Sequence, residues 1–179
     1  MPTIVSHAFV ALAAGAAAGR ARVPPRLWLA GAAAAVVPDL DVVAFALGID
    51  YADAFGHRGA SHSLAFAGVL GLLGALTHRG LRATPWRAGL WIFACTASHA
   101  LLDAFTNGGL GVALAWPWSD VRMFAPWRPI QVSPIGAGFF SARGWAVLRS
   151  ELVWIWLPTL LLASGATALR GRRRNAAAR

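Results

Sequence analysis

Seven imidazole and carboxylate side chains lie in or beside apolar stretches of this 179-residue chain. They are His7, Asp39, Asp41, His57, His62, His99 and Asp103. Imidazole nitrogens and carboxylate oxygens are ligands that divalent zinc, manganese and iron accept. Ionisable side chains are costly in apolar surroundings and usually serve a function there. The set therefore predicts a divalent-metal site, with zinc as the first candidate and manganese or iron as alternatives.

Two spacings within this set suggest which residues share an ion. His99 and Asp103 are four residues apart, so a helix would carry both on one face. We expect these two to share one ion with His57. His57 and His62 are five residues apart, and Ser61 could cap the helix that follows. The structural alternatives are a core histidine hydrogen-bonded to a nearby aspartate, and a capped helix start with histidines on the surface.

Asp39 and Asp41 form a second predicted ligand set, together with His7. Residues two apart on a regular helix would point about 200° away from each other. Pro38 disturbs the turn here, so both carboxylates could face inward. One of them could instead stand behind the ligands as a hydrogen-bond partner, or pair with Arg58.

Seven candidate ligands exceed the needs of one catalytic zinc, which keeps about three protein ligands and a water. Two ions therefore fit better, and such a site activates water and holds the attacking and leaving oxygens. A protein nucleophile is then unnecessary, and the sequence has no G-x-S-x-G elbow. The candidate catalytic residues are Arg58, whose guanidinium suits phosphate, Asp39, and Glu151 as a general acid. Alternatively, Glu151 pairs with Arg149 or Arg143.

Five apolar segments must position these residues: 2–19, 27–49, 59–77, 88–102 and 152–169. The chain is 58% hydrophobic and 13% charged, with a mean hydropathy of +0.57. Soluble domains are about 45–50% apolar and about 25% charged. A helix crosses the bilayer core with about 20 residues. We therefore predict an all-α, polytopic bundle of about five membrane helices, with short buried helices as the alternative.

The distribution of arginine predicts an orientation. All sixteen basic residues are Arg, and eleven of them lie in three stretches without a carboxylate, 20–26, 79–87 and 170–179. With five alternating crossings, these stretches share one side of the membrane, which the positive-inside rule makes the cytoplasm. The N-terminus and the metal residues then lie toward the outer face of the membrane. Residues 1–10 carry no Arg or Lys, so we expect this segment to be retained rather than cleaved as a signal peptide.

The connection 106–151 is rich in Trp and Pro, and we expect it to lie in the outer membrane interface as a lid. Its aromatic residues are Trp116, Trp118, Phe124, Trp127, Phe139, Phe140 and Trp145. Ser141 is placed to cap a helix that continues through Arg149 into the last crossing. We expect residues 1–179 to form a single domain, with 170–179 as a basic cytoplasmic tail.

Several short motifs, taken together, resemble a known family. They are Ser-His-Ala at 6–8, Val-Pro-Asp-Leu-Asp at 37–41, Gly-His-Arg-Gly-Ala-Ser-His-Ser-Leu at 56–64 and Ser-His-Ala-Leu-Leu-Asp at 98–103, followed by matches at 106–109, 116–120, 124–127 and 150–152. The combination resembles the membrane-bound, metal-dependent hydrolases of the YdjM/YbcI type, over nearly the whole chain. That resemblance implies a metal-dependent hydrolase of the bacterial inner membrane, without naming a substrate. The His-x-x-x-Asp pair is also similar to helical zinc-dependent phospholipases C, although those enzymes are soluble and secreted.

These observations predict a hydrolase that attacks a phosphoester or related ester with metal-activated water. Its expected partners are membrane lipid and a lipid or small-molecule substrate. The alternatives are a transporter that binds ions in transit and a protein with a non-catalytic metal site. Few polar residues lie in the inner halves of the predicted helices, which disfavours transport. We expect no nucleic-acid partner, because the Arg tail suits anionic lipid and membrane orientation equally well.

Overall fold

The computed structural model describes residues 1–177, and over that range the chain is helical, with two isolated β-bridges and no strand. The elements are α1 (Ile4–Ala18), α2 (Pro25–Ala34), η1 (Val37–Val42), α3 (Val43–Ala46), η2 (Ala60–His62), α4 (Leu64–Leu76), α5 (Pro85–Ala104), η3 (Gly136–Phe139), α6 (Ala142–Glu151), η4 (Leu152–Trp156) and α7 (Leu157–Ala177). The predicted all-α class is confirmed. Residues 178 and 179 of the predicted basic tail lie outside the described part.

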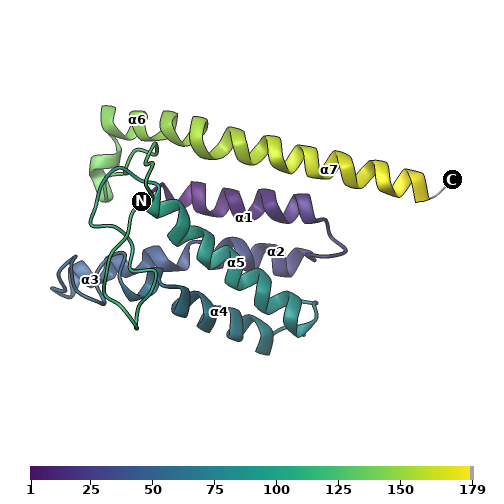
Figure 1. Cartoon of the computed structure of the whole chain (residues 1–179), viewed down its shortest axis with the longest axis horizontal. Coiled ribbons are helices and arrows are strands. Elements are labelled where there is room, and N and C mark those ends of the chain that lie inside the picture. Colours follow the sequence, from purple (N-terminus) through teal and green to yellow (C-terminus); the bar gives the residue numbers. More distant parts are fainter. Residues whose placement is uncertain (178–179) are drawn as a thin grey trace.

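The helices run side by side, with α4 against α5, α2 against α1 and α5, and α7 along α1 (Figure 1). The start of α1, the short elements around α3, the start of α4 and the end of α5 all lie at one end of the bundle (Figure 1). We call this the site end. The α1–α2 and α4–α5 connections and the C-terminal part of α7 lie at the opposite end, and they include the arginine-rich stretches as far as residue 177.

Local signals explain where the helices begin. Thr3 caps α1 by accepting a hydrogen bond from the backbone of Ser6, and prolines occupy the first turns of α2 and α5. The α4 helix begins later than expected, because Ser63 is its cap and accepts a 3.0 Å hydrogen bond from the Phe66 backbone. The prediction of Ser61 as the cap is therefore wrong. That hydroxyl points instead to Asp41.

Small residues let the helices approach closely. A Cβ added to Gly74 on α4 would lie 2.8 Å from the Ile92 side chain on α5, and one on Gly31 of α2 would lie 2.1 Å from Trp91. Neither position has room for a side chain. Small residues permit such close helix contacts, and the tight packing fixes the positions of the helix ends that build the site.

Two described segments are long and apolar enough to cross a membrane, Pro25–Ala46 and Ala142–Ala177. The apolar helices α1 and α4 have only 15 and 13 residues, whereas a crossing takes about 20. The five predicted crossings are therefore not confirmed as such. Two of the predicted segments are also interrupted: a 3-10 turn follows α2 at Pro38, and residues 59–63 precede α4 as a turn. The disturbance expected at Pro38 is present.

The predicted connection 106–151 divides into a long loop and helix α6. The loop is tied to the site end by backbone hydrogen bonds: the amides of Ala113 and Ala125 donate to the carbonyls of Arg58 and Ala104, and the Leu114 carbonyl accepts from the Leu64 amide. As predicted, α6 runs on through a π-helical turn into α7. Ser141 occupies the N-cap position of α6, but its hydroxyl donates backward to the Gly138 carbonyl and makes no capping bond.

Candidate metal centre

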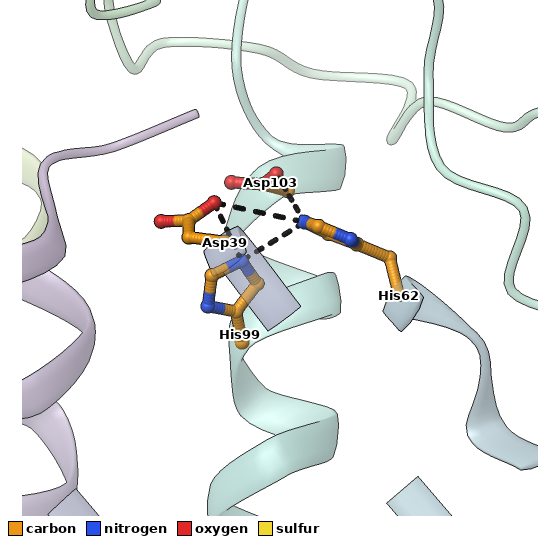
Figure 2. Close-up of side chains that lie close together, drawn as sticks. All are labelled: Asp39, His62, His99 and Asp103. Carbon is orange, nitrogen blue, oxygen red and sulfur yellow. Dashed lines mark hydrogen bonds and ion pairs between the residues drawn. The ribbon is translucent and has the colours of Figure 1, made fainter. Parts of the chain in front are cut away.

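Four of the seven candidate ligands converge at the site end of the bundle. Asp39 of η1, His62 of η2, and His99 and Asp103 of α5 each offer an atom within 4.8 Å of the other three (Figure 2). All four side chains are buried. We call these residues the first group. The single helical face predicted for His99 and Asp103 is what brings those two together.

The hydrogen-bond partners of the two histidines assign their tautomers. His99 Nδ1 lies 2.7 Å from the Ala35 carbonyl oxygen, which can only accept, so Nδ1 carries the proton. Ser61 donates its hydroxyl proton to Asp41 Oδ2 at 2.6 Å. His62 Nδ1, 3.0 Å from the Ser61 hydroxyl, must therefore be the donor in that contact. When both rings are neutral, their Nε2 atoms are left as acceptors, and they face each other across 3.0 Å.

The two carboxylates of the first group also accept no hydrogen bond. Within residues 1–177, none of the four oxygens of Asp39 and Asp103 has a hydrogen-bond partner, although all are buried. Asp39 Oδ1 lies 3.3 Å from His99 Nε2, and Asp103 Oδ2 lies 3.4 Å from His62 Nε2. Acceptors that converge in a buried place without donors are destabilising unless a cation lies between them. This donor set fits a divalent ion such as zinc, which takes histidine nitrogen and aspartate oxygen.

His7 adjoins the first group. Its ring stacks on the His99 ring with centroids 3.6 Å apart, and its Nε2 lies 3.6 Å from Asp103 Oδ1. The side chain is fully buried, and neither ring nitrogen has a hydrogen-bond partner in the described part of the chain. The sequence placed His7 with Asp39 and Asp41. The structure places it against His99 and Asp103 instead, because α1 packs beside the end of α5.

A second group consists of Asp41, His57 and His62. Asp41 Oδ1 lies 2.6 Å from His57 Nδ1. Its Oδ2 accepts from the Ser61 hydroxyl and the Arg58 backbone, and lies 3.1 Å from His62 Nδ1. The prediction that His57 joins His99 and Asp103 is therefore wrong. His62, which lies just before α4, contacts His99 and Asp103 in place of His57. His57 contacts Asp41 instead.

Arg58 lies beside the first group. Its Nε is 2.9 Å from Asp103 Oδ2, in an ion pair whose angles are not those of a hydrogen bond. The two Nη atoms donate to the Gly108 carbonyl and to the Thr106 hydroxyl, each at 3.0 Å. The backbone has a φ of 64°, in the left-handed region that non-glycine residues seldom adopt. The pairing with Asp39 or Asp41 that the sequence left open is thus replaced by a pairing with Asp103.

Glu151 belongs to neither group. It is buried at the end of α6, and its carboxylate accepts from the backbone and hydroxyl of Thr3 and from the hydroxyl of Ser6. The Ser6 hydroxyl also accepts a 2.7 Å bond from Trp156 Nε1. Among the described residues, no arginine forms an ion pair with this carboxylate, so the expected pairing with Arg149 or Arg143 is not present. Glu151 instead anchors the start of α1, directly before His7.

Several polar residues at the site were missed by the sequence analysis. Arg122 donates to the carbonyl of His57 at 2.8 Å and to those of Tyr51 and Asp53, and so holds the loop before the second group. Nothing in the sequence around Arg122 indicates this role. Thr106 was likewise given no role, whereas Ser61 was noted only as a helix cap and not as the donor to Asp41. Burial raises the pKa of the Tyr51 hydroxyl, which therefore stays neutral beside His57.

Fold and site together define an apolar, all-helical protein with a buried His/Asp centre suited to a divalent ion. The chain belongs to the YdjM inner membrane protein family, whose sequence model matches residues 1–173. It is 46% identical over 164 residues to the inner membrane protein YbcI of Escherichia coli (strain K12), covering 90% of this chain and 95% of that protein. No solved structure matches it significantly. The family resemblance is thus confirmed, and these names indicate an inner membrane protein without naming an activity.

Proposed function

We propose that this chain is a membrane-embedded hydrolase that holds one divalent ion, preferably zinc, in the first group and cleaves a phosphoester or related ester. One observation carries the proposal: two imidazole acceptors and the hydrogen-bond-free oxygens of two buried aspartates converge on one point. The charge balance supports it, since among the described residues Asp103 forms an ion pair with the buried Arg58 and Asp39 forms none with an arginine. A divalent ion would offset the remaining negative charge.

The side chains of this chain have distinct tasks in such a reaction. The bound ion would supply Lewis-acid polarisation of water and of a substrate oxygen. Asp39 Oδ1 faces the two histidines, which leaves Oδ2 to take a proton from the attacking water. The water oxygen forms a bond to phosphorus or to the acyl carbon, the ester bond breaks, and the proton passes to the departing alcohol. Arg58 adjoins Asp103 and would stabilise the negative charge that develops.

The second group acts as support for the histidines in this proposal. Both oxygens of Asp41 already have donors, and it contacts His57 and His62 through their Nδ1 atoms. A carboxylate behind a ligating histidine fixes the ring and raises its basicity. The second ion expected from the sequence remains a prediction, for which His57, His62 and Asp41 are the candidate ligands.

We also propose that the site end faces the outer side of the inner membrane. The arginine-rich connections lie at the opposite end of the bundle, where the positive-inside rule places the cytoplasm. The loop after α5 and helix α6 carry exposed tryptophans, as expected for an interfacial belt: Trp118, Trp127 and Trp145. A reporter fused after residue 177 should be active only if it is a cytoplasmic reporter. A periplasmic signal from that fusion would overturn the orientation.

Metal content and hydrolysis, measured on the same detergent-purified samples, test the function. The wild-type protein should contain about one zinc per chain and cleave a chromogenic phosphodiester. Asp103→Asn should lose both, while the matched control Asp120→Asn, at an exposed loop carboxylate, should keep both. A metal-free wild-type protein would mean that a proton lies between the histidines. Full metal with no turnover on phosphodiesters, carboxylic esters and phospholipids would favour the non-catalytic or transport alternatives.

A further inference from the structure

An apolar cleft of about 490 Å³ opens beside the first group. Its walls come from the start of α1, η1, the loop with η3, α6 and η4, and its main apolar side chains are Val42, Ile135, Phe139, Phe140, Leu148 and Trp156. The volume lies within the range of small-molecule sites, about 300–1,000 Å³. The protein therefore has room for a flexible apolar ligand next to its candidate metal centre.

Asp39 connects this cleft to the metal centre. Of the described lining residues, it contributes the one ionisable side chain. It is buried, and neither of its oxygens has a hydrogen-bond partner within residues 1–177. An unpartnered carboxylate in the wall of an apolar cleft is costly, unless a cation such as the ion proposed for the first group lies beside it.

The mouth of the cleft is apolar and exposed. Val5 is 60% exposed and Phe140 is 89% exposed, with Ile4 and Ile135 beside them. Such a rim on a protein of an inner membrane family faces lipid more readily than water. The cleft is thus accessible to a chain that enters from the bilayer.

A polar pocket of about 250 Å³ adjoins the cleft. The two share Met1, Ser133 and Ile135 in their walls. The polar pocket is lined further by His57, Tyr51 and the exposed Arg143. Arginine and a neutral tyrosine hydroxyl suit an anionic group. An apolar cleft joined to a cationic pocket matches a molecule with an apolar chain and an anionic head.

We propose that the cleft binds the apolar chain of an amphiphilic phosphoester taken from the membrane, with its headgroup directed to Arg143 and its scissile ester beside Asp39. This inference rests on the proposed function, and it narrows the substrate class to lipid-like phosphoesters. A second apolar pocket of about 350 Å³ lies beside Asp41, lined by Phe55, Phe66, Val69 and Trp116. It is the weaker site, because hydrogen bonds already occupy both oxygens of Asp41.

Chain-length dependence tests the cleft in the holoprotein. The substrates are alkyl nitrophenyl phosphodiesters from ethyl to octyl, used as monomers. Because each methylene that enters the cleft leaves water, kcat/KM should rise about fourfold per methylene. Val5→Trp fills the mouth of the cleft and should reduce the octyl-to-ethyl ratio of kcat/KM at least tenfold. The matched control Val69→Trp alters a valine of similar exposure, 56%, in the second apolar pocket, and should keep the wild-type ratio.

A binding experiment separates this inference from the proposed function. A monoalkyl phosphate with a diazirine at the end of its chain has no diester to cleave, and its crosslinks can be mapped by mass spectrometry. Labels on 133–140 and at the start of α1 would support the cleft even if no ester were hydrolysed, in which case only the proposed reaction would fail. Hydrolysis without chain-length dependence, or labels confined to Phe55, Phe66 and Trp116, would overturn the cleft while the hydrolase stands.

Discussion

The first and second groups contain the same residue types and share His62, yet their polar atoms have opposite surroundings. Among the described residues, the carboxylate oxygens of Asp39 and Asp103 accept no hydrogen bond, although Arg58 Nε forms an ion pair with Asp103 Oδ2. Those of Asp41 contact the Ser61 hydroxyl, the Arg58 backbone and two imidazole nitrogens. A buried carboxylate without donors is suited to ligate a cation, whereas one with donors is suited to position its neighbours. The comparison distinguishes the candidate metal ligands Asp39 and Asp103 from Asp41, which positions histidines. The residue types alone could not make this distinction.

The largest effect is expected from Asp39→Asn. This change removes a charged ligand from the first group, so the metal affinity should fall by more than the roughly 10–100-fold that supporting residues typically contribute. Turnover should be lost with the metal. Competition with a chelator measures the affinity, and Asp50→Asn, at an exposed aspartate, is the control. If Asp39→Asn bound the metal as tightly as the wild-type protein, Asp39 would not be a ligand and the distinction between the two groups would fail.

Arg58 links the two groups, since its backbone contacts Asp41 and its guanidinium contacts Asp103. Arg58→Lys keeps a positive charge but loses the planar fork that suits a phosphoryl group. We expect turnover to fall by about 10²–10³ while the metal remains bound. The comparison of metal content with kcat in one sample is the measurement. Full turnover in Arg58→Lys would limit Arg58 to a structural role.

Asp41→Asn should have a smaller effect than Asp39→Asn. Loss of the carboxylate behind His62 and His57 should weaken metal binding by about 10–100-fold, with no change in the number of ions at saturating metal. Titration of the apoprotein with zinc gives both quantities. A fall from two ions per chain to one would contradict the supporting role and establish the second ion that the sequence predicts.

Glu151→Gln tests a carboxylate outside both groups. The amide would present a donor to Thr3 and Ser6, which already donate to this position, so the protein should lose about 1–3 kcal/mol of stability. Thermal unfolding in detergent measures the loss, and metal content at saturating zinc should not change. Arg149→Gln, at the exposed neighbour on α6, should leave the melting temperature unaltered. A normal melting temperature with lost turnover would restore the catalytic role predicted for Glu151.

Much of the fold followed from local patterns. The apolar segments and the low charge content indicated an all-helical bundle, and the 3-10 turn occurs at Pro38, where a disturbance was expected. The failures have local causes. Ser63 rather than Ser61 caps α4, because a competing acceptor, Asp41, engages Ser61. The α4 helix is shorter than the predicted segment 59–77 because a turn takes up residues 59–63, whereas α1 lies between caps at Thr3 and Gly19 and is short because its apolar segment is short.

The sequence by itself determined which residue types the site could use, that His99 and Asp103 share a face, and that arginine gathers in connections away from the ligands. The tertiary structure decided the role of each. The Ala35 carbonyl orients His99, Ser61 and Asp41 orient His62, and Glu151 anchors the helix that carries His7. Apart from Ser61, which directly precedes His62, these partners are far apart in the chain or are ordinary backbone atoms. A side chain that can bind the ion differs from one that positions a neighbour only in whether its polar atoms already have hydrogen-bond partners. Helix packing decides which side chains have such partners.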